Sequence, residues 1–109
     1  MDALDRIHQL VITHRIIIFM KGTPKRPMSD ESARAIKLLT KYVSEIRVIN
    51  IQAEPEIRAF LPIYQDWNHF PQLYINGDLI GGAEVLEDLE EQGELGPLLK
   101  QNSMQLQSA

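Results

Sequence analysis

The sequence predicts an α/β fold in which a four-stranded mixed sheet carries helices on both faces. Ile16–Met20 is an apolar run of strand length with no polar face, which is typical of a strand covered from both sides. Helical and strand-like patterns then alternate, as they do in a parallel strand–helix–strand crossover. Late in the chain, Asn76-Gly77 separates two short apolar runs and predicts a type I′ antiparallel hairpin.

Each element is predicted from apolar spacing or from a turn residue. The predicted helices cover residues 3–11, 30–43, 55–64, 83–92 and 97–101. The predicted strands are residues 16–20, residues 46–51 and two short strands within 71–82. Asp2 is a candidate cap for the first helix, and Pro62 is expected to end or bend the third. The whole chain, 1–109, is expected to form a single domain, with 102–109 as a flexible tail.

Composition excludes several classes of function. The net charge of -4 argues against nucleic acid and anionic membranes, because both favour a basic surface. No apolar run approaches the ~20 residues that a bilayer crossing requires, and the acidic N-terminus differs from a leader peptide, so a cytoplasmic location is expected. His8 and His14 are interpreted as surface or helix-end residues. The chain has no cysteine, and therefore no disulfide or thiolate of its own.

Short motifs stand at two places that the predicted fold brings to the sheet. KGTP at 21–24 follows the first strand, and Pro27 and Ser32 come soon after it. WNHFPQ at 67–72 precedes the hairpin, and Gly81-Gly82 ends it. In combination these stretches resemble the monothiol glutaredoxins, a branch of the thioredoxin-like fold. The resemblance spans nearly the whole chain.

The resemblance implies a function and a ligand. Members of this family carry out thiol–disulfide exchange with glutathione, share a 2Fe-2S cluster and act in iron-sulfur and redox homeostasis, in some cases with a BolA-like protein. By resemblance, the backbone before a cis proline at Pro71 pairs with the cysteinyl unit of glutathione. The full set of glutathione-binding residues implied here is Lys21, Arg58, Phe70, Pro71, Gly82, Ala83 and Glu84.

The sequence departs from the family pattern at the reactive centre. Ser29 stands where the family has its indispensable cysteine, and Asp30 and Glu31 replace the following glycine and phenylalanine. Ala83 replaces a second cysteine, and Glu84 replaces an aspartate. A serine hydroxyl stays protonated and forms no mixed disulfide, and iron-sulfur clusters require sulfur ligands. We therefore predict a pseudoenzyme without thiol chemistry, without a family-type cluster and without a metal site.

Three interpretations of Ser29 and its surroundings remain open at this level. The favoured one is a helix cap, because serine is among the preferred capping residues. A second is a hydrolase in which His69, which replaces a threonine of the family motif, activates Ser29. A third is a glutathione-dependent oxidoreductase or 2Fe-2S carrier whose sulfur is supplied by another molecule. The first predicts a binding or scaffold module with a residual groove for glutathione or an extended peptide. Glutathione binding is expected to be weak, because Lys21 and Arg58 attract its carboxylates while Glu31 repels them.

Overall fold

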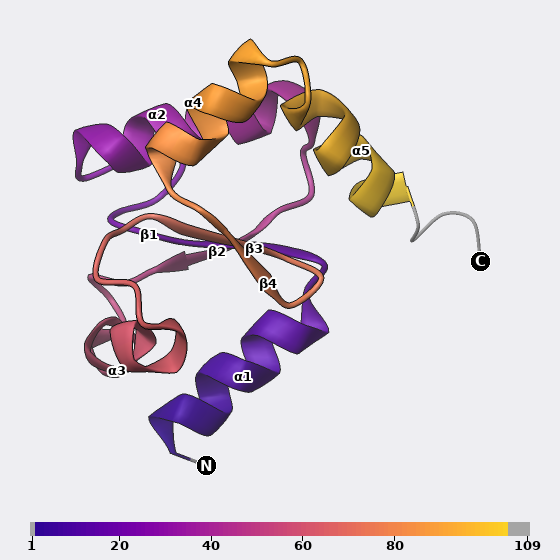
Figure 1. Ribbon diagram of the computed structural model, residues 1–109. Helices are drawn as coiled ribbons and strands as arrows, with labels where there is room; N and C mark the ends of the chain where they lie inside the picture. Colours follow the sequence, from indigo (N-terminus) through magenta and orange to yellow (C-terminus); the bar gives the residue numbers. More distant parts are fainter. Residues whose placement is uncertain (1, 105–109) are drawn as a thin grey trace.

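The computed structural model describes residues 2–104, and within them the elements follow the predicted order (Figure 1). In chain order they are α1 (Ala3–Thr13), β1 (Ile16–Met20), α2 (Asp30–Tyr42), β2 (Arg47–Asn50), α3 (Pro55–Gln65), β3 (Gln72–Ile75), β4 (Asp78–Gly81), α4 (Ala83–Glu91) and α5 (Leu95–Met104). Asp2 caps α1 as expected, since its side chain accepts a hydrogen bond from the backbone N–H of Asp5. None of the helices in this described part has the length and apolar character needed to cross a bilayer.

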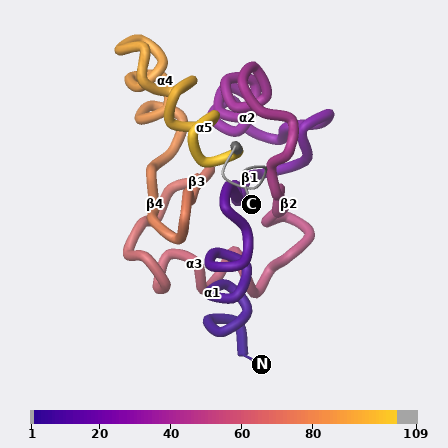
Figure 2. The backbone as a smooth tube through the Cα atoms, turned by 90° about the vertical axis from the view of Figure 1, so that its right-hand side faces the viewer, coloured from indigo at the N-terminus to yellow at the C-terminus, as the bar shows by residue number. Residues whose placement is uncertain are grey.

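The strands form one sheet in the order β2-β1-β3-β4. β1 pairs in parallel with β2 and antiparallel with β3, and β3 pairs antiparallel with β4. In Figure 1, α1 and α3 lie on one side of the sheet, and α2, α4 and α5 lie on the other. Figure 2, turned by a quarter, shows the same two helical layers. The predicted four-stranded mixed sheet with helices on both faces is confirmed.

Strand β1 forms the centre of the core. All five of its residues are buried, as the apolar run predicts. Ile16, Ile18 and Met20 pack in a cluster with α2, α4 and α5, whereas Ile17 and Phe19 pack in a second cluster with α1 and α3. Burial of each such side chain contributes about 1.5–3 kcal/mol before entropy is counted. The loop that leaves β1 therefore starts from one of the most firmly held points of the fold.

The hairpin turn has the predicted geometry. Asn76 and Gly77 have φ values of 53° and 85°, and a type I′ turn requires positive φ at both central residues. The turn also bonds to the start of β1, since the backbone N–H of Asn76 donates to the carbonyl of Arg15 over 2.9 Å. The register of β3 and β4 thus follows from two residues of sequence.

Two helices extend past their predicted ends. Helix α3 continues through Pro62, as its predicted range of 55–64 requires, and ends one residue later at Gln65. Its residues Ile57 and Leu61 are buried in the core cluster that includes Ile17 and Phe19 of β1. Helix α5 is longer than expected and includes 102–104, the start of the predicted tail. Asn102 is buried there, and its amide donates to the carbonyl of Leu98 over 2.8 Å. The rest of that predicted tail, 105–109, lies outside the described residues.

Ion pairs join α2 to α4. Arg34 pairs with Glu87 over 2.6 Å, and Lys41 pairs with Glu90. Hydrogen bonds from Lys41 and Tyr42 lower the pKa of the Glu90 carboxyl below its usual value. These groups are partly exposed, so solvent screens each pair and its contribution to stability is small. The two pairs link α2 to α4 at two points along the helices.

Candidate functional site

The segment between β1 and α2 is a closed loop rather than a free strand end. Gly22 forms an isolated bridge with Pro27, and the backbone N–H of Met28 donates to the carbonyl of Lys21 over 2.8 Å. Thr23 and Arg26 exchange two backbone hydrogen bonds of 3.0–3.1 Å across the tip. Gly22 has φ of 92°, a conformation that side-chain-bearing residues rarely adopt. The KGTP motif therefore has a structural basis in this loop.

Two side chains hold the loop by accepting hydrogen bonds from its backbone. Ser32 Oγ accepts a hydrogen bond from the backbone N–H of Lys21 over 3.0 Å. Asn50, at the end of β2, accepts from the backbone N–H groups of Gly22 and Gln52 over 2.9 and 3.0 Å. The role of Asn50 was not predicted from the sequence. Its place at the carboxyl end of the strand predicted to lie beside β1 could have indicated this role, because a polar side chain there is close to the KGTP loop.

Ser29 is the cap of α2, as predicted. Its backbone is extended, and its Oγ accepts a hydrogen bond from the backbone N–H of Ser32 over 3.0 Å. Asp30 and Glu31 occupy the first turn, where carboxylates interact favourably with the positive end of the helix dipole. Asp30 also pairs with Arg34 over 3.0 Å. The helix start therefore already has its own acceptor and two negative charges.

Replacing Ser29 by alanine tests the capping role. We expect Ser29→Ala to lower the free energy of unfolding by about 1 kcal/mol, because one N–H of the first turn loses its acceptor. Urea denaturation followed by circular dichroism measures this loss. Ser44→Ala is the matched control, since Ser44 is exposed between α2 and β2, and it should leave stability unchanged. Equal stability of both variants would argue against the cap.

Most of the predicted ligand residues line one cavity beside α2. The cavity has a volume of about 270 Å³. It is lined by Glu31, Trp67, His69, Phe70, Pro71, Gly82, Ala83, Glu84 and Val85. The peptide bond between Phe70 and Pro71 is cis, as the resemblance implied. We call this cavity the groove. Trp67 and Val85 are lining residues that the list of predicted contacts did not include, although Trp67 belongs to the motif that supported the resemblance.

Lys21 and Arg58 do not line the groove. Lys21 is half-buried at the end of β1, where its backbone N–H is bound by Ser32, and Arg58 is exposed on α3. Neither cation forms an ion pair with a described residue. The two predicted carboxylate-binding cations therefore stand outside the cavity that collects the other predicted residues.

The start of α4 forms one wall of the groove. Gly82 is the N-cap of this helix and provides no side-chain hydrogen bond to its first turn. A Cβ atom on Gly82 would lie 3.0 Å from the carbonyl oxygen of Pro71, so glycine allows α4 to approach the segment before β3. First-turn N–H groups without a side-chain acceptor attract an anion, because they combine free donors with the positive end of the helix dipole.

Aromatic and charged side chains also line the groove. Trp67 and His69 meet edge to face with ring centroids 6.1 Å apart. The indole Nε1 of Trp67 is buried and has no hydrogen-bond partner among residues 2–104. Glu31 and Glu84 are exposed carboxylates at the rim, and neither forms an ion pair within that range. The groove thus combines an anion-attracting helix start with carboxylates that attract a cation.

The hydrolase interpretation of Ser29 receives little support from its contacts. Within the described part of the chain, its Oγ bonds to the backbone of Ser32, and no hydrogen bond joins it to His69. His69 lines the groove, whereas Ser29 does not. No group of three or more histidine, aspartate or glutamate side chains among residues 2–104 is close enough together to hold a metal ion.

Known proteins are similar to this chain in sequence and in fold. A glutaredoxin family profile matches residues 16–80. The chain is 43% identical over 84 residues to the probable monothiol glutaredoxin GrlA of Legionella pneumophila, and the matched region covers 77% of this chain and 94% of that protein. It resembles the solution structure of a monomeric truncated mutant of Trypanosoma brucei 1-C-Grx1, with a TM-score of 0.82, 26% identity and 94% and 93% of the two chains covered. It also shares the fold of a buckwheat glutaredoxin-glutathione complex, with a TM-score of 0.79, 24% identity and 93% and 90% covered.

Proposed function

The chain belongs to the glutaredoxin family, in its monothiol branch, and we propose that it acts as a non-catalytic binding or scaffold module. In this proposal it keeps a groove for glutathione or an extended peptide but has no thiol chemistry of its own. The family resemblance links such a module to iron-sulfur or redox homeostasis, with a BolA-like protein as one candidate partner. The proposed location is the cytoplasm.

The observation that carries the proposal is the composition of the groove. Five residues predicted to bind glutathione line one cavity, while Ser29 is engaged as a helix cap. The start of α4 suits a carboxylate, and Glu84 beside it suits an ammonium group. The γ-glutamyl end of glutathione carries both groups on one carbon atom. Phe70 and Trp67 offer apolar walls for the rest of an extended ligand.

The same groove predicts that binding is weak. Glutathione is an anion at neutral pH, and Glu31 adds a further negative charge to the lining. The two cations that the resemblance assigns to its carboxylates, Lys21 and Arg58, lie outside the cavity. Attraction from these exposed cations is screened by solvent and salt. An extended peptide with fewer negative charges would meet less repulsion in this groove than glutathione does.

The residues present do not fit a 2Fe-2S cluster or a thiol reaction. Fe–S clusters are held mainly by cysteine thiolates, and the chain contains no cysteine. The hydroxyl of Ser29 stays protonated, so it can neither attack a disulfide nor replace a thiolate at iron. We therefore assign no redox step to this chain. Any ligand is bound in the groove without a covalent bond to it.

Calorimetry with reduced glutathione tests the groove. We expect a Kd above about 1 mM for the wild-type chain. Glu31→Gln should tighten binding about threefold, because it removes one repulsive charge at the rim. Glu91→Gln, an exposed position at the far end of α4, is the control of equal charge and should change nothing. Tight binding that Arg58→Ala removes would contradict the weak-binding part and support a groove completed by that arginine.

A second experiment addresses the absence of catalysis. A glutathione-dependent reductase assay on the purified chain, corrected for the blank, should show no turnover. Anaerobic reconstitution with iron and sulfide should leave the protein colourless by visible absorption. Measurable turnover, or stable sulfur-to-iron absorption bands, would instead support the alternative of a family-type oxidoreductase or cluster carrier with sulfur supplied by another molecule.

A further inference from the structure

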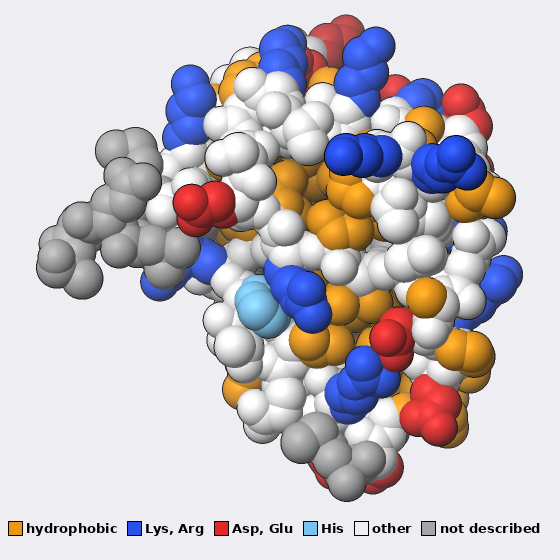
Figure 3. All heavy atoms as spheres, turned by 180° about the vertical axis from the view of Figure 1, so that it is seen from behind, with side chains coloured by type: hydrophobic (Ala, Val, Ile, Leu, Met, Phe, Trp, Pro, Cys, Tyr) orange, Lys and Arg blue, Asp and Glu red, His pale blue; other side chains and the backbone are white. Residues whose placement is uncertain are grey.

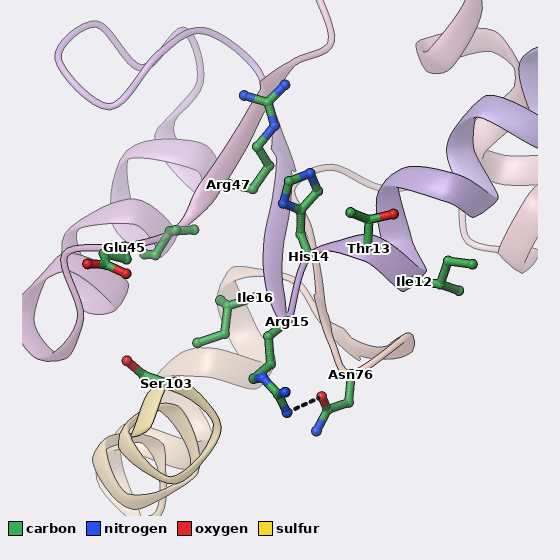
Figure 4. Close-up of a pocket in the computed structure, with 10 residues that line it drawn as sticks. Ile12, Thr13, His14, Arg15, Ile16, Glu45, Arg47, Asn76 and Ser103 are labelled. Atoms are coloured by element: carbon green, nitrogen blue, oxygen red, sulfur yellow. Dashed lines mark hydrogen bonds between the residues drawn. The ribbon is translucent and has the colours of Figure 1, made fainter. Parts of the chain in front are cut away.

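A second and larger cavity lies at the other end of the sheet. It has a volume of about 530 Å³ and lies between the end of α1, the starts of β1 and β2, the β3–β4 turn and α5. The groove described above adjoins the loops at the carboxyl end of β1, so the two cavities are separate. Figure 4 shows this second cavity, which we call the basal pocket.

The basal pocket gathers positive charge in an acidic protein. The chain has a net charge of -4, yet the lining contains the guanidinium groups of Arg15 and Arg47 and the imidazole of His14, against the single carboxylate of Glu45. In Figure 4, Arg47 and His14 lie at one side of the pocket, and Arg15 lies at the other beside Asn76. Figure 3 shows a histidine beside a basic side chain on the rear face of the molecule, next to exposed hydrophobic side chains. This lining attracts an anion.

One wall of the pocket is fixed by hydrogen bonds. Arg15 Nη1 donates to Asn76 Oδ1 over 3.2 Å, and Asn76 in turn donates to the buried Asn102 of α5. The backbone of Arg15 accepts from the N–H of Asn76. These bonds join the segment before β1, the β3–β4 turn and α5, with Asn76 bonded to both Arg15 and Asn102. A pocket with such a fixed wall needs little rearrangement to accept a ligand.

The opposite side offers a guanidinium group with no ion pair. Arg47 is the first residue of β2, is exposed, and forms no ion pair with any residue within 2–104. Strand β2 is an edge strand and pairs with β1 along its other side, where Arg47 stands opposite Ile17. His14 follows the last turn of α1 and is half-buried. A planar guanidinium beside an imidazole is well suited to a carboxylate or a phosphate.

The rest of the lining consists of three isoleucines and two residues with hydroxyl groups. Ile12, Ile16 and Ile46 contribute hydrophobic surface, and Thr13 and Ser103 contribute polar surface. Pockets of several hundred Å³ that combine apolar side chains with a few polar groups are typical sites for small organic ligands. We propose that the basal pocket binds a small organic anion, a carboxylate or phosphate monoester with an apolar body, whose charged group is held by Arg47 and His14. This site is independent of the proposed groove.

Amide chemical-shift titration tests the proposal on the full chain. Phenyl phosphate and phenylacetate serve as the two probes, with inorganic phosphate and benzyl alcohol as the probes that lack one part of the ligand. We expect saturable shifts for one of the first two below about 10 mM, concentrated at residues 12–16, 45–47, 76 and 103. Which of the two binds more tightly distinguishes a phosphate from a carboxylate head group.

Variants assign the binding to named groups. Arg47→Gln should weaken binding about tenfold, because hydrogen bonds to a charged group are lost. Arg26→Gln removes the same charge from the loop at the other end of the sheet and should leave the affinity unchanged. Glutathione titrations of both variants should be unaltered, which separates this site from the groove.

Four outcomes would overturn the proposal. The first is the absence of saturable shifts with either organic anion. The second is equal binding of inorganic phosphate, which would show that the apolar body of the ligand does not contribute to binding. The third is equal binding of benzyl alcohol, which would show that the charged group of the ligand does not contribute. The fourth is equal weakening by Arg47→Gln and Arg26→Gln, which would reduce the effect to general charge.

Discussion

Gly22→Ala is expected to lower the free energy of unfolding by about 3 kcal/mol. A Cβ atom at this position would lie 2.3 Å from the carbonyl oxygen of Arg26 and 2.7 Å from the backbone nitrogen of Met28. Both are backbone atoms of the closed loop, so they cannot move without opening it. The φ of 92° adds conformational strain for any residue with a side chain. Urea denaturation followed by circular dichroism measures the loss.

Gly93→Ala is the control that separates the cost of backbone strain from the cost of steric clash in Gly22→Ala. Gly93 also has a positive φ, 75°, but a Cβ atom there would have no heavy atom within 4 Å. Its replacement should therefore cost only the conformational part, about 1 kcal/mol. The difference between the two variants measures the close packing of the loop. Equal losses would show that the loop tolerates a methyl group and that Gly22 is needed only for its backbone angle.

The parts of the fold that short patterns determine could be predicted from sequence. Burial of β1 on both faces follows from Ile16–Met20 because no polar side chain there requires water. The hairpin follows from Asn76-Gly77 because few residue pairs adopt two positive φ angles without cost. The cap at Ser29 follows from a hydroxyl placed one residue before a helical pattern. Each of these is decided by neighbours in the chain.

The parts that depend on distant neighbours could not be predicted in this way. Asn102 reads as part of a polar tail, yet it is buried, and a hydrogen bond donated by Asn76, 26 residues earlier, offsets the cost of removing its amide from water. Gly96 and Pro97 suggest a break but lie in the first turn of α5, where proline is tolerated because its missing N–H would have no helical partner. Gly96 lies close to the ring of Tyr42, which only the packed structure reveals.

Of the two candidate sites, the groove could be predicted from a sequence motif and the basal pocket could not. The groove residues at 70–71 and 82–84 were predicted because a family motif names them, and the cavity contains all five. Arg58 was assigned by the same resemblance, but its position on α3 keeps it out of the lining. The basal pocket follows no motif, because it joins the ends of five elements that are far apart in the sequence. His14, interpreted as a helix-end residue, lies there.

Ser29→Cys is expected to create a reactive thiol whose reactivity the neighbouring carboxylates restrain. At this position the sulfur would accept from the N–H of Ser32, and the start of α2 would favour the thiolate. Asp30 and Glu31 oppose that effect, although Arg34 partly neutralises Asp30. Alkylation by iodoacetamide at neutral pH should therefore be about threefold faster in Ser29→Cys/Glu31→Gln than in Ser29→Cys alone.

The absence of any other cysteine makes this measurement clean, because each variant contains one thiol and the wild-type chain contains none. Ser44→Cys gives the reference rate of an exposed thiol away from a helix start. If Ser29→Cys reacts at that reference rate and Glu31→Gln does not increase it, the field at the start of α2 does not control the site. If the double variant also gains glutathione-dependent reductase activity, the missing sulfur atom alone separates this groove from a catalytic one. If it gains a fast thiol but no such activity, the groove has also lost the contacts that hold glutathione, as the exclusion of Lys21 and Arg58 from its lining leads us to expect.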